Sequence, residues 1–118
     1  MSGILHLTLK RQWFDAIFFG DKREEYRELK PYWTRRLVGN WQDYQHNPPA
    51  YRSQLQMPKG VTQICFRNGY QKDARAFCIE WMGLEVNTPR TNWCPLDTDY
   101  AQAVYVLKLG GILTNNFT

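Results

Sequence analysis

Three runs of β-branched and aromatic residues in the second half of the chain constrain its fold most strongly, because such runs predict strands. They cover residues 61–67, 75–86 and 103–109, and residues 68–73 predict a hairpin loop between the first two. Gly83 lies within the second run and indicates a bulge or a bend, by which a small sheet curls. The second half is therefore expected to form a curved sheet.

The first half of the chain adds one strand and two short helices to this expectation. Over residues 5–10, leucine alternates with a polar residue, as in a half-buried strand. Apolar residues at i,i+4 spacing predict a helix over residues 12–19, and Gly20 is suited to end it. A proline at the first position of residues 31–38 predicts a second helix there. Both helices lie before the main strands.

The length of 118 residues fits one compact domain and leaves too little chain for two. Aromatic residues make up 15% of the chain, so even a small core contains large side chains. Residues 40–59 are polar and broken by three prolines, and we interpret them as a long loop within the domain. The chain is thus predicted to form a single α+β domain over residues 1–118, with four to six strands in a small curved sheet or barrel.

Charge and cysteine content bear on partners and location. The chain has 15 Lys and Arg against 11 Asp and Glu, and the resulting +4 lies in residues 1–59, which mildly favours an anionic partner. No apolar stretch is long enough to span a membrane or to act as a signal peptide, so we expect a cytoplasmic protein without membrane contact. The three cysteines, Cys65, Cys78 and Cys94, favour reduced thiols over a disulfide framework or a metal site.

The sharpest motif is the run Gly20-Asp21-Lys22-Arg23-Glu24-Glu25-Tyr26-Arg27, which follows the first predicted helix and fits G-x-K-x-x-E-x-R. If it forms a strand, Glu25 and Arg27 share a face, where the carboxylate fixes the guanidinium and the remaining donors can hold a phosphate or a base edge. Lys22 adds a compact cation that can serve as a base or a nucleophile. The alternative is a solvated charged edge with weak ion pairs.

On this motif the chain resembles the ASCH domain family of the PUA-like superfamily, since Gly20, Lys22, Glu25 and Arg27 occupy all four signature positions. The order of predicted elements is also similar, and the whole chain looks like the short stand-alone members found in bacteria and phages. The resemblance implies a PUA-like barrel with two or three short helices. It further implies that the motif lines a cleft that binds RNA or a nucleotide-like ligand.

Enzymatic members of this family suggest an alternative function on the same ligand class. The N4-acetylcytidine amidohydrolases have a lysine at the Lys22 position but a threonine where this chain has Glu25, so Glu25 would have to activate a water. In a ribonuclease, Lys22 would stabilise the negative charge of the phosphorane, and Tyr26 or Glu25 would transfer a proton. Lys22, Glu25 and Tyr26 are the catalytic candidates, and Glu80 is a second carboxylate if it faces the cleft.

Aromatic and basic residues near the motif are typical of single-stranded nucleic-acid binding, because bases stack on rings and arginine binds phosphate. The predicted hairpin loop is a second candidate, in which Arg67 and Asn68 read a base edge while Tyr70 stacks. Core positions for the tryptophans are the alternative, and a protein partner is a third interpretation.

We predict an RNA or nucleoside ligand and no metal or cofactor. The predicted binding residues are Lys22, Arg23, Glu25, Tyr26, Arg27, Trp33, Arg36, Arg67, Asn68 and Tyr70.

Overall fold

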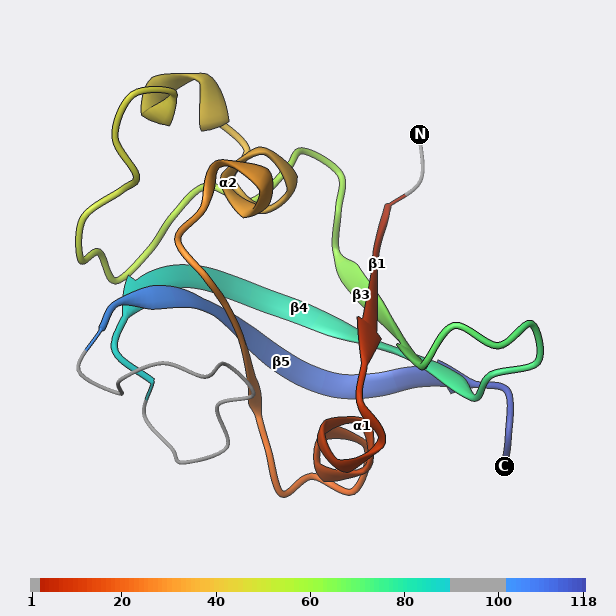
Figure 1. Ribbon diagram of the computed structural model, residues 1–118. Coiled ribbons are helices and arrows are strands. Elements are labelled where there is room, and N and C mark those ends of the chain that lie inside the picture. The colour runs from red at the N-terminus through yellow and green to blue at the C-terminus, as the bar shows by residue number, and fades with distance from the viewer. Residues whose placement is uncertain (1–2, 90–101) are drawn as a thin grey trace. The chain divides into compact units, whose positions relative to one another are not determined.

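The computed structural model describes residues 3–89 and 102–118, which fall into two compact units (Figure 1). The first unit consists of the described residues up to Arg23, residues Gly60–Met82 and residues Leu109–Thr118. The second unit consists of residues Glu24–Lys59 and the described part of Gly83–Lys108. A single domain over the whole chain stays a prediction.

The described residues contain five strands and two α-helices, so the fold is α+β, as the sequence predicted. Hydrogen bonds link the strands in the order β1-β3-β4-β5-β2. The two longest strands, β4 and β5, have residues in both units. The elements are β1 Ile4–Leu9, α1 Arg11–Phe18, β2 Glu24–Arg27, α2 Pro31–Leu37, the 3-10 helix η1 Trp41–Tyr44, β3 Gln63–Asn68, β4 Ala76–Asn87 and β5 Val104–Asn115.

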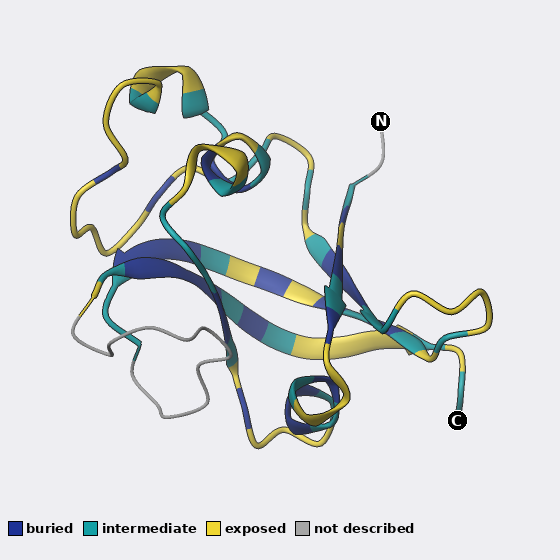
Figure 2. Ribbon diagram, viewed as in Figure 1, coloured by how far each residue is buried: buried dark blue, intermediate teal, exposed yellow. Residues whose placement is uncertain are grey.

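In the first unit, β3 pairs with β1 in parallel and with β4 in antiparallel orientation. The leucines of β1 are buried and its other residues are more exposed, which confirms the alternation seen in the sequence (Figure 2). Helix α1 buries Phe14, Ala16 and Ile17. Gly20 has φ +84°, a left-handed conformation that suits glycine, and it ends the helix as expected.

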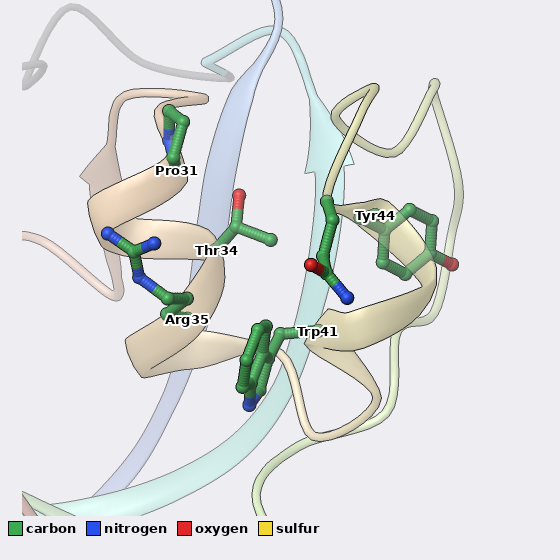
Figure 3. A pocket seen from close by; sticks show the side chains of 6 residues that line it. Pro31, Thr34, Arg35, Trp41 and Tyr44 are labelled. Carbon is green, nitrogen blue, oxygen red and sulfur yellow. The ribbon is translucent and has the colours of Figure 1, made fainter.

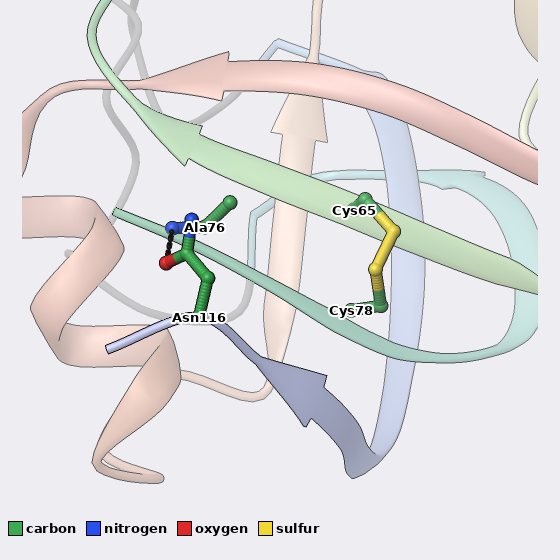
Figure 4. The surroundings of a disulfide bond; sticks show 4 residues. All are labelled: Cys65, Ala76, Cys78 and Asn116. Atoms are coloured by element: carbon green, nitrogen blue, oxygen red, sulfur yellow. Dashed lines mark hydrogen bonds between the residues drawn. A yellow bond between two sulfur atoms is a disulfide. The ribbon is translucent and has the colours of Figure 1, made fainter. Parts of the chain in front are cut away.

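The cysteines of the first unit correct the sequence-based expectation, because a disulfide joins Cys65 on β3 to Cys78 on β4 (Figure 4). The two residues are register partners. Backbone hydrogen bonds at the flanking pairs 62–81 and 68–75 put Cys65 and Cys78 at a non-hydrogen-bonded pair, where side chains lie closest. Reduced thiols were therefore the wrong prediction for these two residues, and Cys94 lies outside the described residues.

In the second unit, β2 pairs with β5 in antiparallel orientation, and Tyr26, Val104 and Val106 form a buried cluster. Helix α2 begins at Pro31, as predicted, and buries Thr34 and Leu37. The Tyr105 hydroxyl lies 2.5 Å from the Thr34 hydroxyl, and burial raises the pKa of Tyr105 above its usual 10.0. These contacts fix α2 on the strands of its own unit.

The long polar loop of residues 40–59 is anchored within the second unit by backbone hydrogen bonds. Gly39 donates to the Gln56 carbonyl and Leu55 donates to the Leu84 carbonyl, both at 2.7 Å. Arg52 forms an isolated bridge with Val86. The loop is therefore ordered, and it contains η1. None of the helices in the described parts of the chain is long and apolar enough to cross a membrane.

Candidate functional site

The G-x-K-x-x-E-x-R motif is divided between the two units after Arg23. Gly20 and Lys22 belong to the first unit, whereas Glu25 and Arg27 lie on β2 in the second. The strand begins at Glu24, so Lys22 precedes it and does not take part in its alternation. Each half of the motif is therefore a candidate site within its own unit.

Lys22 is almost completely buried, with 3% of its surface exposed. Its ammonium lies 4.8 Å from the centroid of the Trp13 ring, a cation–π contact with a residue of α1. The Lys22 backbone N–H donates to the Ala16 carbonyl at 3.0 Å, so the turn at Gly20 folds the chain back onto α1. Both contacts hold the lysine in one position.

Lys22 also lines a pocket in the first unit with a volume of about 220 Å³. Its walls are apolar side chains of α1, β4 and β5 together with three glycines, and Lys22 and Arg23 are its charged lining residues. Such a pocket is suited to a small anionic ligand with an apolar part. Glu80 does not line it, since this exposed carboxylate accepts the Gly111 N–H at 2.8 Å.

Glu25 and Arg27 form an ion pair, with Arg27 Nη2 2.7 Å from Glu25 Oε2. This contact confirms that the two side chains share a face of the strand. Glu25 has no exposed surface, so Arg27 compensates a fully buried carboxylate. The Arg27 guanidinium also lies 4.7 Å from the centroid of the Trp33 ring. Arg27 is thus fixed from two sides.

Arg27, Tyr32, Trp33 and Arg36 form what we call the arginine–aromatic cluster of the second unit. The Arg36 guanidinium lies 5.4 Å from the Trp33 ring centroid and 5.6 Å from that of Tyr32. It also donates to the Tyr32 hydroxyl at 3.1 Å. Trp33 is therefore within cation–π distance of two guanidinium groups, while Tyr32 is exposed. From the sequence we predicted only that aromatic and basic residues occur near the motif, and not which of them contact one another.

A network of charged residues in the second unit was not found by sequence reasoning. The Lys108 ammonium lies 3.4 Å from the Glu24 carboxylate and 3.2 Å from that of Glu85. Tyr26 donates to Glu24 at 2.9 Å and has no exposed surface. A ligand contact by Tyr26, or by the equally buried Glu25, would require the surrounding chain to move. The sequence signal for this network was the presence of Glu85 and Lys108 within two mainly apolar strand runs.

The hairpin loop after β3 forms as predicted, with Gly69 at φ +87° and Tyr70 89% exposed. The Arg67 guanidinium donates to the Gln71 carbonyl within the same loop. Asn68 donates its backbone N–H to Arg75 at the base of the hairpin. The Tyr70 ring is accessible, whereas Arg67 helps to shape the turn.

Comparison of the chain with protein-family models, with curated proteins and with solved structures found no match. The resemblance to ASCH domains and the residue roles that it implies therefore stay predictions. Among the residues that the structure describes, no three His, Cys, Asp or Glu side chains are grouped so that they could hold a metal ion.

Proposed function

We propose that this protein binds single-stranded RNA, or a nucleotide derived from it, through the arginine–aromatic cluster. The observation that carries the proposal is the Trp33 ring, which has the guanidinium groups of Arg27 and Arg36 at 4.7 and 5.4 Å. Stacking of a base on an aromatic side chain contributes about 1–3 kcal/mol, and nearby arginines bind phosphate. A base on this cluster would meet ring faces and cations that are already fixed in place.

The charge of the same segment supports an anionic ligand. Residues 24–59 contain six basic and four acidic side chains, and three of the acids, Glu24, Glu25 and Glu28, already have cationic partners in the unit. On α2, Arg35 is exposed and Arg36 is partly exposed, so an anionic ligand can reach both. We expect binding to weaken as salt rises, because each phosphate contact releases counterions.

The ASCH resemblance supports the same ligand class and adds a PUA-like fold and a cytoplasmic location to the proposal. Lys22 would then contact the ligand in the first unit, where its pocket of about 220 Å³ has cationic and apolar walls. The disulfide between Cys65 and Cys78 counts against a reducing compartment, since such bonds persist mainly in oxidising ones.

The proposed binding is tested by fluorescence anisotropy with labelled single-stranded RNA across a salt series. We expect Trp33→Leu to weaken binding and Arg36→Gln to weaken it while lowering the salt slope by about one. Arg11→Gln is the matched control, because Arg11 is an exposed arginine of the first unit that pairs with Asp15. Absence of binding by the wild type at low salt, or equal affinities of the Arg36 and Arg11 variants, would refute the proposal.

A hydrolase acting on RNA or on an acylated cytidine is the second candidate, favoured by the buried Lys22 in the wall of a pocket. A lysine amine held there can act on a bound ligand as a base or stabilise negative charge. The test incubates RNA and N4-acetylcytidine separately with wild type and with Lys22→Met. Shortened RNA or free cytidine from the wild type alone would establish the activity, and no product from either variant would exclude it.

A further inference from the structure

A second pocket lies within the second unit, between α2 and η1, and no predicted site includes it (Figure 3). Its volume is about 100 Å³. This volume is well below the roughly 300–1,000 Å³ of pockets for drug-sized ligands, so it suits a single planar ring. The pocket is lined by Pro31, Thr34, Arg35, Trp41, Tyr44 and Gln45.

The α2 wall of this pocket is fixed by hydrogen bonds from behind. Thr34 donates its hydroxyl proton to the Lys30 carbonyl at 3.1 Å, so Tyr105 is the donor in the 2.5 Å contact between the two hydroxyls. Burial raises the pKa of Tyr105, and its hydroxyl therefore keeps this proton at neutral pH. The Thr34 side chain is thus held in one orientation.

The η1 wall is fixed in a similar way. Arg52 donates to the Tyr44 hydroxyl at 2.7 Å and places its guanidinium 5.9 Å from the ring centroid. Gln45 donates its amide to the Gln42 carbonyl at 3.3 Å. The walls are therefore formed before any ligand arrives, which lowers the entropy cost of binding.

Two lining residues remain available for a ligand. Within residues 3–89 and 102–118, the Arg35 side chain makes no ion pair or hydrogen bond, and it is exposed. Trp41 is half-buried and lines the same pocket, and the Arg35 guanidinium extends away from the indole, toward Pro31 (Figure 3). An indole ring and an uncompensated guanidinium in the lining of one pocket match a planar base that is linked to a phosphate.

We propose that this pocket holds one nucleobase of a bound RNA strand, stacked on Trp41, with Arg35 on the adjoining phosphate. The inference rests on the proposed function, because the same helix supplies both surfaces. The arginine–aromatic cluster uses Tyr32, Trp33 and Arg36 of α2, and the pocket uses Thr34 and Arg35. The two sets of residues lie on different faces of α2, so a strand that contacts both must pass around this helix, which is about 10 Å long.

The test measures binding of labelled single-stranded RNA to the wild type and to Trp41→Leu, Trp41→Phe and Arg35→Gln. We expect Trp41→Leu to raise the Kd about tenfold, since it removes one stacked base. Trp41→Phe keeps a ring face and should retain most of the affinity. Phe19→Leu is the matched control, because Phe19 is an exposed ring at the end of α1 in the first unit. Thermal melts of each variant establish that it is folded.

The outcomes separate this inference from the proposed function. A tenfold loss in Trp41→Leu, largely restored in Trp41→Phe and absent in Phe19→Leu, supports a base in the pocket. If binding is lost in Trp33→Leu but unchanged in Trp41→Leu, the pocket does not hold a base, while the proposed function is still supported. If Trp41→Leu does not fold, the Kd of Arg35→Gln is compared with that of the wild type instead. An unchanged Kd overturns the inference. No binding by the wild type overturns both.

Discussion

The two units of this protein use aromatic residues in different ways. In the first unit, rings contact rings: Phe77 lies 4.8 Å from Phe14, 5.3 Å from Phe18 and 5.6 Å from Phe66 between centroids. In the second unit, Tyr32, Trp33 and Tyr44 all contact arginine side chains. Rings that cover one another exclude water and stabilise the fold, whereas rings beside arginine form cation–π contacts.

The comparison has exceptions in both units. In the second unit, the Tyr32 and Trp33 rings lie 4.9 Å apart between centroids. The first unit has two contacts between a ring and a cation. Lys22 contacts Trp13, and Arg75 lies 5.8 Å from the half-buried Phe117. Trp13 is half-buried as well. Burial does not separate the two uses completely, because the half-buried Phe18 contacts the exposed Phe19 ring and the exposed Tyr32 contacts Trp33.

The largest effect is expected from Phe77→Ala in the first unit. Phe77 is 1% exposed and contacts three other rings, so its removal leaves a cavity that should cost about 3–5 kcal/mol of unfolding free energy. Urea unfolding measures this loss. Phe19→Ala, at a ring that is 72% exposed, should change stability by less than about 0.5 kcal/mol. Equal effects of the two substitutions would mean that the ring cluster does not stabilise the unit.

A smaller loss is expected from Arg27→Met in the second unit. It removes the guanidinium 2.7 Å from the fully buried Glu25 carboxylate, which should cost about 3 kcal/mol in urea unfolding. Arg35→Met is the matched control, because this arginine is exposed and should contribute little to stability. A variant Arg27→Met as stable as the wild type would show that the ion pair of Arg27 with Glu25 does not stabilise the unit.

The smallest effect is expected from pH, through Tyr105. Burial raises the pKa of Tyr105 above 10.0, so the unfolded chain loses this proton at a lower pH than the folded one. The contribution to stability is therefore complete below about pH 10 and falls as pH rises above it, by at most about 1.4 kcal/mol per pH unit. Urea unfolding of wild type and Tyr105→Phe at about pH 8 and pH 10.5 measures the difference. If the unfolding free energy changes equally between the two pH values in both proteins, the predicted contribution of Tyr105 is absent.

Local patterns in the sequence predicted what depends on neighbours along the chain. The leucine alternation of β1, the end of α1 at Gly20 and the pairing of Glu25 with Arg27 all follow from spacing of a few residues. The end of β5 was predicted too early, at residue 109, just before Gly110 and Gly111. The strand continues through them, and Glu80 accepts the Gly111 N–H from outside.

Contacts between distant residues could not be predicted in this way. The disulfide depends on which residues of β3 and β4 are opposite one another, and the sequence of one strand alone does not determine that register. The Glu24, Lys108 and Glu85 network likewise needs the pairing of β2 with β5. The pocket between α2 and η1 was missed because residues 41–45 show no periodicity that would indicate a helix.

The disulfide also determines what a protease could release from this chain. Cys65 and Cys78 are 13 residues apart, and the segment between them contains the exposed residues Tyr70, Lys72 and Arg75. A cut after Lys72 would break the backbone within the hairpin loop, and a cut after Arg75 would break it at the base of the hairpin. The two fragments would nevertheless remain one covalent molecule, because the cystine joins them on either side of the cut. They would separate only after addition of both a denaturant and a reductant.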